Sequence, residues 1–303
     1  MRVLIVVNKW WECDPALAAM LNDNARPAGS PWPQDLRPPR PRPELTSVPN
    51  LHPIPRAIFP YKNFAAEVWC ISDILDGLSS ARQSSSQEKF NRLCGIFPDA
   101  PCFEKPSLVI AVGTASVPFD GVNHNGCVVA GTGTFMHNGF PDGSNPDSNL
   151  NLPSFDKLVT STIPDAMFNA LCAVDTAAAV QHFLPVPLNP ATPASLLIDR
   201  ESVALGTINV TKTSDYAAKD CLTVAAYRAL GSSAPPAVSL ETTHGLIREK
   251  AGACPFVFVS AIVNRFQQFG TDVAPRMYAQ QTAAATNAGV ALSWMLASLD
   301  AHS

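Results

Sequence analysis

Several apolar runs in this chain do not alternate with polar residues, and this pattern constrains the fold more than any other feature. Residues 256–263 read Phe-Val-Phe-Val-Ser-Ala-Ile-Val, and residues 3–7 read Val-Leu-Ile-Val-Val. A strand whose successive side chains are apolar must be covered on both faces, as in parallel sheets. Helical patterns separate these runs at the spacing of α/β proteins. We therefore expect an α/β fold of three layers.

The order of these patterns predicts a single domain over residues 1–303, because no linker divides the chain after residue 60. Asp14 and Pro15 are expected to cap and open the first helix, since proline has no N–H to leave unpaired there. The expected strands are 2–7, 65–71, 108–112, 127–130, 196–198, 203–210, 237–240 and 256–263. The expected helices are 14–22, 84–97, 166–183, 217–230, 241–251 and 274–299, with a loop at 140–156.

Residues 27–60 form a proline-rich insertion that holds eleven prolines. Proline fixes φ and donates no backbone hydrogen bond, so this segment is neither a central strand nor a helix. We expect an extended surface loop, which covers a site or a subunit contact. The alternative is a PxxP ligand for a partner domain.

Composition excludes several classes of protein. With 47% hydrophobic and 15% charged residues, the chain is not a disordered one. The net charge of −4 argues against a nucleic-acid partner. No apolar run reaches the roughly 18 residues that span a membrane, and the first run is too short for a signal peptide. The eight cysteines form no C-x-x-C pair, which favours reduced thiols and a cytoplasmic location.

Familiar catalytic motifs are missing from the sequence. There is no GxxxxGK[ST] loop, no GxGxxG after the first strand, no GxSxG and no HExxH. His124 and His137 lie in turn-forming segments, and the six histidines lack ligand spacing. We therefore expect solvated loop histidines, no metal site and no cofactor.

Polar residues follow three expected strands, at the edge where an open α/β sheet normally holds its site. The segments are Val-Gly-Thr-Ala-Ser at 112–116, Ser-Leu-Glu-Thr-Thr-His at 239–244, and the polar end of 259–268. A small-residue turn exposes N–H groups to an anion or sugar, and Asn, Arg and Gln recognise amide-like edges. Taken singly, each segment has an ordinary explanation. The first is a common turn after a strand, the glutamate of the second is an acidic residue in the first turn of a helix, and the third is a surface turn.

Together these segments resemble the nucleoside phosphorylase and nucleosidase superfamily, with uridine phosphorylase as the most similar branch. Ile262-Val-Asn-Arg-Phe-Gln-Gln268 is similar to that branch's IVNRTQQ at all but one position. Segments 112–115, 126–129 and 238–242 stand where the family has GTTG, GDVVV and an MES-type sequence. The order and spacing agree from about 108 to 299. The resemblance implies a three-layer α/β/α phosphorylase-like fold with a central mixed, twisted sheet.

The resemblance also implies how a nucleoside is held. Glu241 would accept hydrogen bonds from the ribose 2′ and 3′ hydroxyls and stabilise the positive charge that develops on the sugar. Leu240 would pack on the ribose. Gly113 and Thr114, in the GTTG-like turn, would contact the nucleophile or the sugar.

Other residues would contact the base. Arg265 and Gln267 would engage its carbonyl, and Tyr216 would stack on it, next to Ser214 in the segment 213–216 that resembles the base pocket. Asn264 stands where purine-cleaving branches have an aspartate that protonates the base. Because an amide supplies no proton, Asn264 favours a pyrimidine-like base or another way of stabilising the leaving group.

The nucleophile stays open between phosphate and water. Phosphorolytic members carry an arginine where this chain has Ala111, and the glycine-plus-arginine phosphate loop is replaced by residues 7–11. A phosphate dianion needs cationic donors. The candidates are Lys9, Lys212, Arg37, Arg40, Arg42 and Arg56.

We therefore expect an enzyme that cleaves the N-glycosidic bond of a nucleoside, a small-molecule substrate, with phosphate as co-substrate or with water. The alternative is a non-catalytic nucleoside-binding or assembly protein that kept the fold. The resemblance further implies a homo-oligomer, a dimer, trimer or hexamer, with no nucleic-acid or membrane partner.

Overall fold

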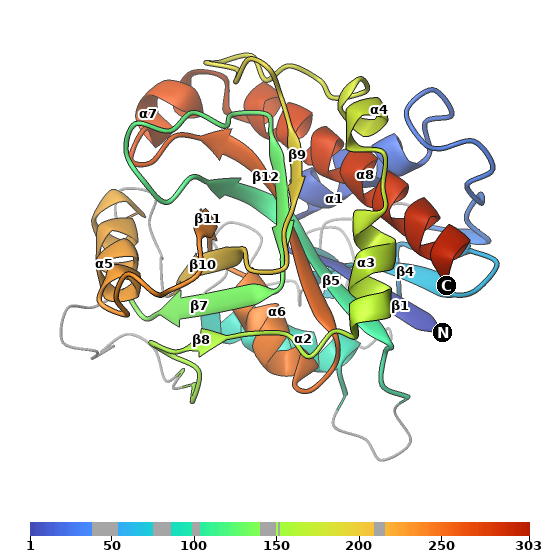
Figure 1. Cartoon of the computed structure of the whole chain (residues 1–303), viewed down its shortest axis with the longest axis horizontal. Coiled ribbons are helices and arrows are strands. Elements are labelled where there is room, and N and C mark those ends of the chain that lie inside the picture. Colours follow the sequence, from blue (N-terminus) through green and yellow to red (C-terminus); the bar gives the residue numbers. More distant parts are fainter. Residues whose placement is uncertain (38–53, 75–85, 99–103, 140–149, 151, 209–215) are drawn as a thin grey trace, which may run out of the picture.

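The computed structural model describes residues 1–37, 54–74, 86–98, 104–139, 150, 152–208 and 216–303 (Figure 1). Its strands are β1 (Arg2–Val7), β2 (Asp35–Leu36), β3 (Ala57–Pro60), β4 (Ala65–Cys70), β5 (Leu108–Ser116), β6 (Val128–Gly131), β7 (Gly133–His137), β8 (Leu158–Val159), β9 (Leu196–Ile198), β10 (Val203–Thr207), β11 (Ala237–Glu241) and β12 (Phe256–Asn264). Its α-helices are α1 (Trp10–Met20), α2 (Ser86–Ile96), α3 (Asp165–Cys172), α4 (Thr176–Val180), α5 (Tyr216–Arg228), α6 (His244–Ala251), α7 (Phe269–Asp272) and α8 (Met277–His302).

The apolar strands are covered on both faces, which confirms the three-layer α/β prediction (Figure 1). Along β1, Val3, Ile5 and Val7 face one hydrophobic cluster, whereas Leu4 and Val6 face the other. Helices α1, α3 and α8 cover the first cluster. Helices α2, α5 and α6 cover the second. Successive side chains of a strand point to opposite faces, so an unbroken apolar run requires both layers.

The sheet is mixed, as predicted, and part of it closes into a ring. Strand β5 runs parallel to β1 and β12, and β12 pairs antiparallel with β6. The chain passes through Thr132 from β6 into β7, which pairs with β10. Strand β10 pairs with β11, and β11 returns to β5 where Leu240 lies opposite Ser116. Because Asn264 of β12 also lies opposite Ser116, the ends of β5, β11 and β12 meet at one point.

The proline-rich insertion contributes short strands only at the edge of the sheet. Strand β3 pairs antiparallel with β4, and β2 pairs with β3. The prediction of an extended loop was wrong at these residues. The exclusion of a central strand holds, because β2 is the edge of the sheet and β3 lies next to it, away from the centre where proline is not tolerated. Residues 38–53 lie outside the described residues, so the PxxP alternative stays a prediction.

The first predicted helix begins at another residue, and the third is interrupted. The first helix begins at Trp10 instead of Asp14 and has Pro15 in its interior, because Glu12 accepts the N–H of Lys9 at 3.1 Å and starts the helix one turn earlier. The helix predicted over 166–183 is two helices, α3 and α4. Asp175 breaks it by accepting the N–H of Ala178 at 2.9 Å and capping α4.

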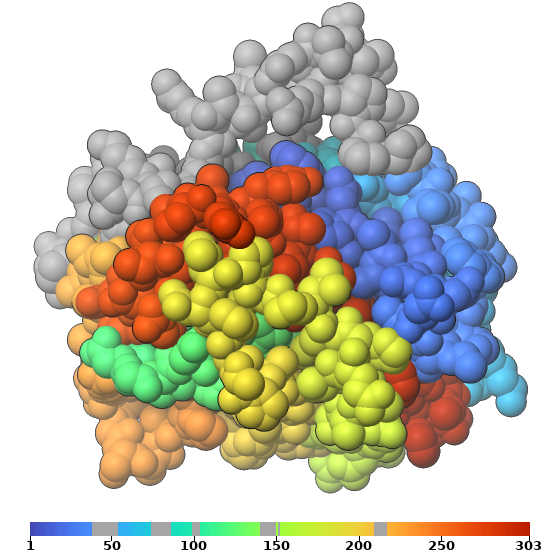
Figure 2. All heavy atoms as spheres, turned by 90° about the horizontal axis from the view of Figure 1, so that it is seen from above, coloured from blue at the N-terminus to red at the C-terminus, as the bar shows by residue number. Residues whose placement is uncertain are grey.

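Other parts of the sequence had given no clear signal. Strand β7 was not predicted, and the prediction of a solvated turn histidine at His137 was wrong, because His137 ends this strand. That side chain is buried, and its Nδ1 lies 2.6 Å from Asp156 Oδ1. Figure 2 shows residues near 183–195, in yellow, against the red and orange C-terminal part, in agreement with a hydrogen bond of 2.9 Å from Leu188 N to Gln280 Oε1.

Among the described helices, none is long and apolar enough to cross a membrane.

Candidate functional site

The turn that ends β5 places Thr114 against a carboxylate from α1. Thr114 donates to Glu12 Oε1 twice, from its backbone N at 2.8 Å and from Oγ1 at 2.7 Å. Glu12 is only 7% exposed. The donors that the sequence predicts to face a sugar or an anion are therefore occupied by Glu12. Both lone pairs of Oε1 are engaged in this way.

Glu241 ends β11 and begins the turn into α6. Its carboxylate accepts the N–H of His244 at 2.8 Å and also the N–H of Thr243. An anion at this position satisfies unpaired donors of the helix start and complements its dipole. A carboxylate has about four acceptor positions, and these two bonds leave Glu241 with about two.

His244 lies in the interior beside Glu241. Its side chain is 2% exposed, and Nδ1 lies 3.5 Å from Glu241 Oε1 and 3.5 Å from Ser260 Oγ. The ring packs at a tilt against Phe258, with centroids 5.9 Å apart. Its Nε2 is buried and makes no hydrogen bond within the part of the chain that the structure describes. A buried imidazole nitrogen normally has a partner, so this atom needs an explanation.

Two lysines add positive charge near these carboxylates. Lys89 of α2 donates to Thr242 Oγ1 at 3.1 Å. Burial, helped by the charge of Lys9, lowers the pKa of Lys89 to about 7, against the opposing effect of Glu241 and Glu12. Burial also lowers the pKa of Lys9, which Glu12 opposes. We call Lys9, Glu12, Lys89, Thr114, Glu241 and His244 the Glu12–Glu241 cluster.

The end of β12 is organised differently. Asn264 Nδ2 donates to the carbonyl of Arg265 at 2.8 Å. Arg265 donates from Nε and Nη2 to Asp272 at 3.0 and 2.8 Å. Burial alone would raise the pKa of Asp272, but the hydrogen bonds from Arg265, Asn125 and Asn189 hold it well below its usual range. Arg265 is thus committed to Asp272 through two of its three nitrogens, and its predicted contact with a base stays a prediction.

The other predicted residues lie in different places. Gly113, Thr114 and Glu241 lie within or beside the Glu12–Glu241 cluster. Leu240 is 3% exposed and lies in the hydrophobic core. Gln267 adopts a φ of 58° and its Nε2 contacts Cys221 Sγ on α5. Tyr216 begins α5, but Ser214 lies outside the described residues.

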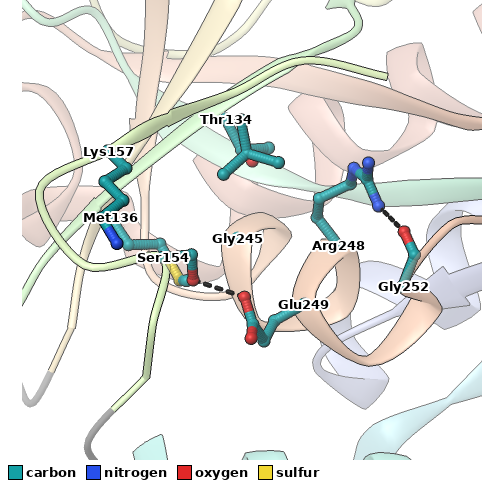
Figure 3. A pocket seen from close by; sticks show the side chains of 9 residues that line it. Thr134, Met136, Ser154, Lys157, Gly245, Arg248, Glu249 and Gly252 are labelled. Carbon is teal, nitrogen blue, oxygen red and sulfur yellow. Dashed lines mark hydrogen bonds between the residues drawn. The ribbon is translucent and has the colours of Figure 1, made fainter. Parts of the chain in front are cut away.

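Two cavities among the described residues lie elsewhere. One has about 170 Å³ between β7 and α6 and is lined by Thr134, Met136, Ser154, Lys157, Val159, Gly245, Arg248, Glu249 and Gly252 (Figure 3). In it, Ser154 donates to Glu249 and Arg248 donates to the carbonyl of Gly252. The other has about 320 Å³ near Tyr227 and Arg228. Neither is lined by Thr114, Glu241 or Arg265, so the predicted residues do not share one of these cavities.

Sequence reasoning missed Glu12, Lys89 and the burial of His244 beside Glu241. The spacing of Lys9 and Glu12, which fits a helix start, was the only local signal for Glu12. Lys89 had none, since its burial comes from α2 packing on the second face of the sheet. Among the described residues, no three His, Cys, Asp or Glu side chains are grouped so as to hold a metal ion.

Three of the six predicted phosphate donors lie in the part of the chain that the structure describes, and of these Lys9 alone belongs to the cluster. Arg56 is buried and pairs with Asp14 at 2.8 Å and with Asp73. Ala111 is fully buried in β5. Lys9 belongs to the cluster, Arg37 is exposed, and Arg40, Arg42 and Lys212 lie outside the described residues.

Solved structures with a similar fold span nearly the whole chain. The 5′-methylthioadenosine/S-adenosylhomocysteine nucleosidase of Campylobacter jejuni has a TM-score of 0.52 and 10% identity, covering 98% of this chain and 98% of that chain. The Helicobacter pylori nucleosidase of the same name, with butyl-thio-DADMe-Immucillin-A, gives 0.51 and 12%, with 98% of each chain covered. Futalosine hydrolase of Helicobacter pylori gives 0.50 and 12%, covering 98% and 97%.

These comparisons confirm the predicted phosphorylase/nucleosidase fold. At such low identities they establish the fold alone. No protein-family model matches the chain, and no curated protein matches its sequence. The uridine phosphorylase branch therefore stays a prediction.

Proposed function

We propose that this protein is a nucleosidase, an enzyme that cleaves the N-glycosidic bond of a nucleoside with water. One observation carries the choice of water: Glu12 occupies both donors of Thr114 in the turn after β5. A phosphate dianion there would lose those donors and lie beside a carboxylate. Water carries no charge and meets no such penalty. The similar solved structures include nucleosidases and a hydrolase, which supports the same choice.

Glu241 is the residue that holds the sugar in this proposal. The acceptor positions that the backbone leaves free match the two hydroxyls of a ribose diol. As the glycosidic bond breaks, the sugar becomes oxocarbenium-like, and a nearby carboxylate stabilises that charge. The rigid start of α6 keeps the carboxylate in place before substrate arrives.

The leaving base is pyrimidine-like in this proposal. Asn264 ends β12 and offers no titratable proton. A base whose anion is stabilised by its own carbonyl groups leaves without protonation by this residue. A purine would need an acid from elsewhere.

The test is a base-release assay on purine and pyrimidine nucleosides, 5′-methylthioadenosine included, each with and without phosphate, followed by chromatography. Release without phosphate, with free pentose as product, is the expected result. Strict dependence on phosphate, with a pentose 1-phosphate formed, would make the protein a phosphorylase. Binding without release would favour the alternative of a nucleoside-binding protein, in which Glu241 serves only the start of α6.

A further inference from the structure

We propose that Lys89 is a positioning residue for Glu241: its ammonium group, anchored on Thr242, balances the charge of the Glu241 carboxylate and keeps that side chain ionised. The inference rests on the proposed function and adds the group that supports the sugar-binding residue. It joins two observations on this chain. One is a hydrogen bond from α2 into the turn after β11, and the other is the burial of charged groups from α1, α2 and β11 around that turn.

Lys89 lies in the interior and contacts the turn between β11 and α6. It is 7% exposed, and its Nζ donates to Thr242 Oγ1 at 3.1 Å. Thr242 is the only hydrogen-bond partner of this ammonium group in the described part of the chain. Thr242 Oγ1 lies 3.3 Å from Thr243 Oγ1, and the N–H of Thr243 is one of the two that Glu241 accepts. Lys89 is therefore held next to the backbone that fixes the Glu241 carboxylate.

The carboxylates near this turn are buried and need positive charge in their neighbourhood. The side chain of Glu241 is 7% exposed, and Glu12 is 7% exposed. An ionised carboxylate without a compensating charge is costly in a protein interior. Both carboxylates raise the pKa of Lys89 against the effect of burial, Glu241 more than Glu12. The attraction is mutual, so the charge of Lys89 favours the ionised form of Glu241.

Other charged groups face Lys89 or Glu241. Lys9, which precedes α1, and Arg92 of α2 oppose the charge of Lys89, but both are partly exposed. A buried charge is screened less by solvent, so Lys89 acts on Glu241 with less screening than these two cations. His244 Nδ1 lies 3.5 Å from Glu241 Oε1 and adds a positive charge only when the ring is protonated. His244 is present in wild type and variant alike, so a difference between them reports on Lys89.

The pKa of Lys89, about 7, determines the pH at which this support acts. Below pH 7 the ammonium group is charged and opposes protonation of Glu241. At alkaline pH Lys89 is neutral, and carboxylates are ionised with or without it. A variant without the charge should therefore differ from wild type at acid pH and resemble it at alkaline pH. A purely structural role would instead lower activity by a similar factor at every pH.

Lys89→Met tests the charge, because methionine has a similar shape and no charge. For base release from a nucleoside, kcat/KM should be about 3- to 10-fold below wild type at pH 5 and within about twofold at pH 9, with the acid limb moved to higher pH. Replacing a buried charge by an apolar group does not cost stability as a rule. Thermal unfolding at pH 5 checks that the loss does not come from unfolding. Lys105→Met, at an exposed lysine, is the matched control and should keep the wild-type profile.

Lys89→Arg tests whether a charge at this position is sufficient, since arginine stays protonated over the whole range. This variant should return the acid limb to within about 0.3 pH of wild type. If it does not fold, Lys89→Met decides the matter. Base release by the wild-type protein, with a Lys89→Met profile parallel to that of wild type, overturns this inference and leaves the proposed function standing. Absence of base release by the wild-type protein would remove the proposed function and this inference with it.

Discussion

Two polar groups of side chains lie at the ends of neighbouring strands and differ in how far their hydrogen bonds are satisfied. At the end of β12, Asp272 is fully buried, and each of its oxygens accepts at least two hydrogen bonds, from Arg265, Asn125 and Asn189. We call these four residues the Asp272 cluster; its carboxylate is saturated, although the buried Oδ1 of Asn125 has no partner among the described residues. In the Glu12–Glu241 cluster, His244 Nε2 is buried without a partner among the described residues.

This difference separates a structural role from a functional one. A carboxylate whose acceptor positions are all engaged, such as that of Asp272, fixes one conformation and has no capacity left for a ligand. The Asp272 cluster holds the turn from β12 into α7 against the segment around Asn189, seen in yellow beside the orange and red region in Figure 2. The Glu12–Glu241 cluster keeps unused acceptors on Glu241 and His244. A ligand with hydroxyl groups or a water molecule would complete it.

From this comparison we expect a substitution of Glu241 to have the largest effect on turnover. Glu241→Ala should reduce nucleoside turnover at least about 100-fold, because a contact that strengthens in the transition state is lost. Glu201→Ala, an exposed glutamate in a turn, is the control and should leave turnover unchanged. Steady-state kinetics of base release measures both. Unchanged turnover in Glu241→Ala would remove this residue from the site.

A substitution in the Asp272 cluster should instead lower the thermal stability of the protein. Asp272→Ala leaves the buried amide of Asn125 and the N–H of Arg265 without an acceptor. The midpoint of thermal unfolding should therefore fall by roughly 5–10 °C. Turnover of the folded fraction at 20 °C should stay within about threefold. A large loss of turnover in a variant with normal thermal stability would place Asp272 in the active site and break the comparison.

The sequence predicted those parts of the fold that depend on local pattern. Unbroken apolar runs located β1, β5 and β12, since only strands covered on both faces tolerate them. The same reasoning could not predict where α1 begins or the break before α4. Both depend on one acidic side chain, Glu12 or Asp175, accepting a backbone N–H.

The candidate site was predicted only where a motif had a known counterpart. Glu241, Gly113 and Thr114 were found through the resemblance. Glu12 and Lys89 were missed, because residues 12 and 89 come near residue 241 only when α1 and α2 pack on the sheet that contains β11. The predicted homo-oligomer and the cytoplasmic location stay predictions.

Lys89 offers a smaller, pH-dependent effect. Its pKa is about 7 in the folded protein, against a reference value of 10.5. Between these values the unfolded chain binds more protons, so stability rises with pH and the burial of Lys89 costs most below pH 7. Lys89→Met should raise the unfolding midpoint by about 2–4 °C at pH 6, with the gain shrinking toward pH 10. Thermal unfolding at several pH values measures this, with the exposed Lys105→Met as control. A gain independent of pH would mean that Lys89 does not titrate in this range.

Asp220 gives the smallest effect and the opposite sign, away from both clusters. Burial raises its pKa to about 7, against a reference value of 3.8, although a hydrogen bond of 2.7 Å from Thr207 Oγ1 lowers it. Between these values the folded protein binds more protons, so stability falls as pH rises from about 4 to 7.

Asp220→Asn keeps the acceptor for Thr207 and removes the charge. It should raise the unfolding midpoint by about 1–3 °C at pH 8 and give no gain at pH 4. The exposed Asp120→Asn is the control, and an equal gain at both pH values would exclude titration of Asp220 as the cause. Because Asp220 has a hydroxyl partner and no carboxylate or imidazole beside it in the described chain, its variant should leave turnover unchanged, which tests whether a raised pKa alone marks a functional site.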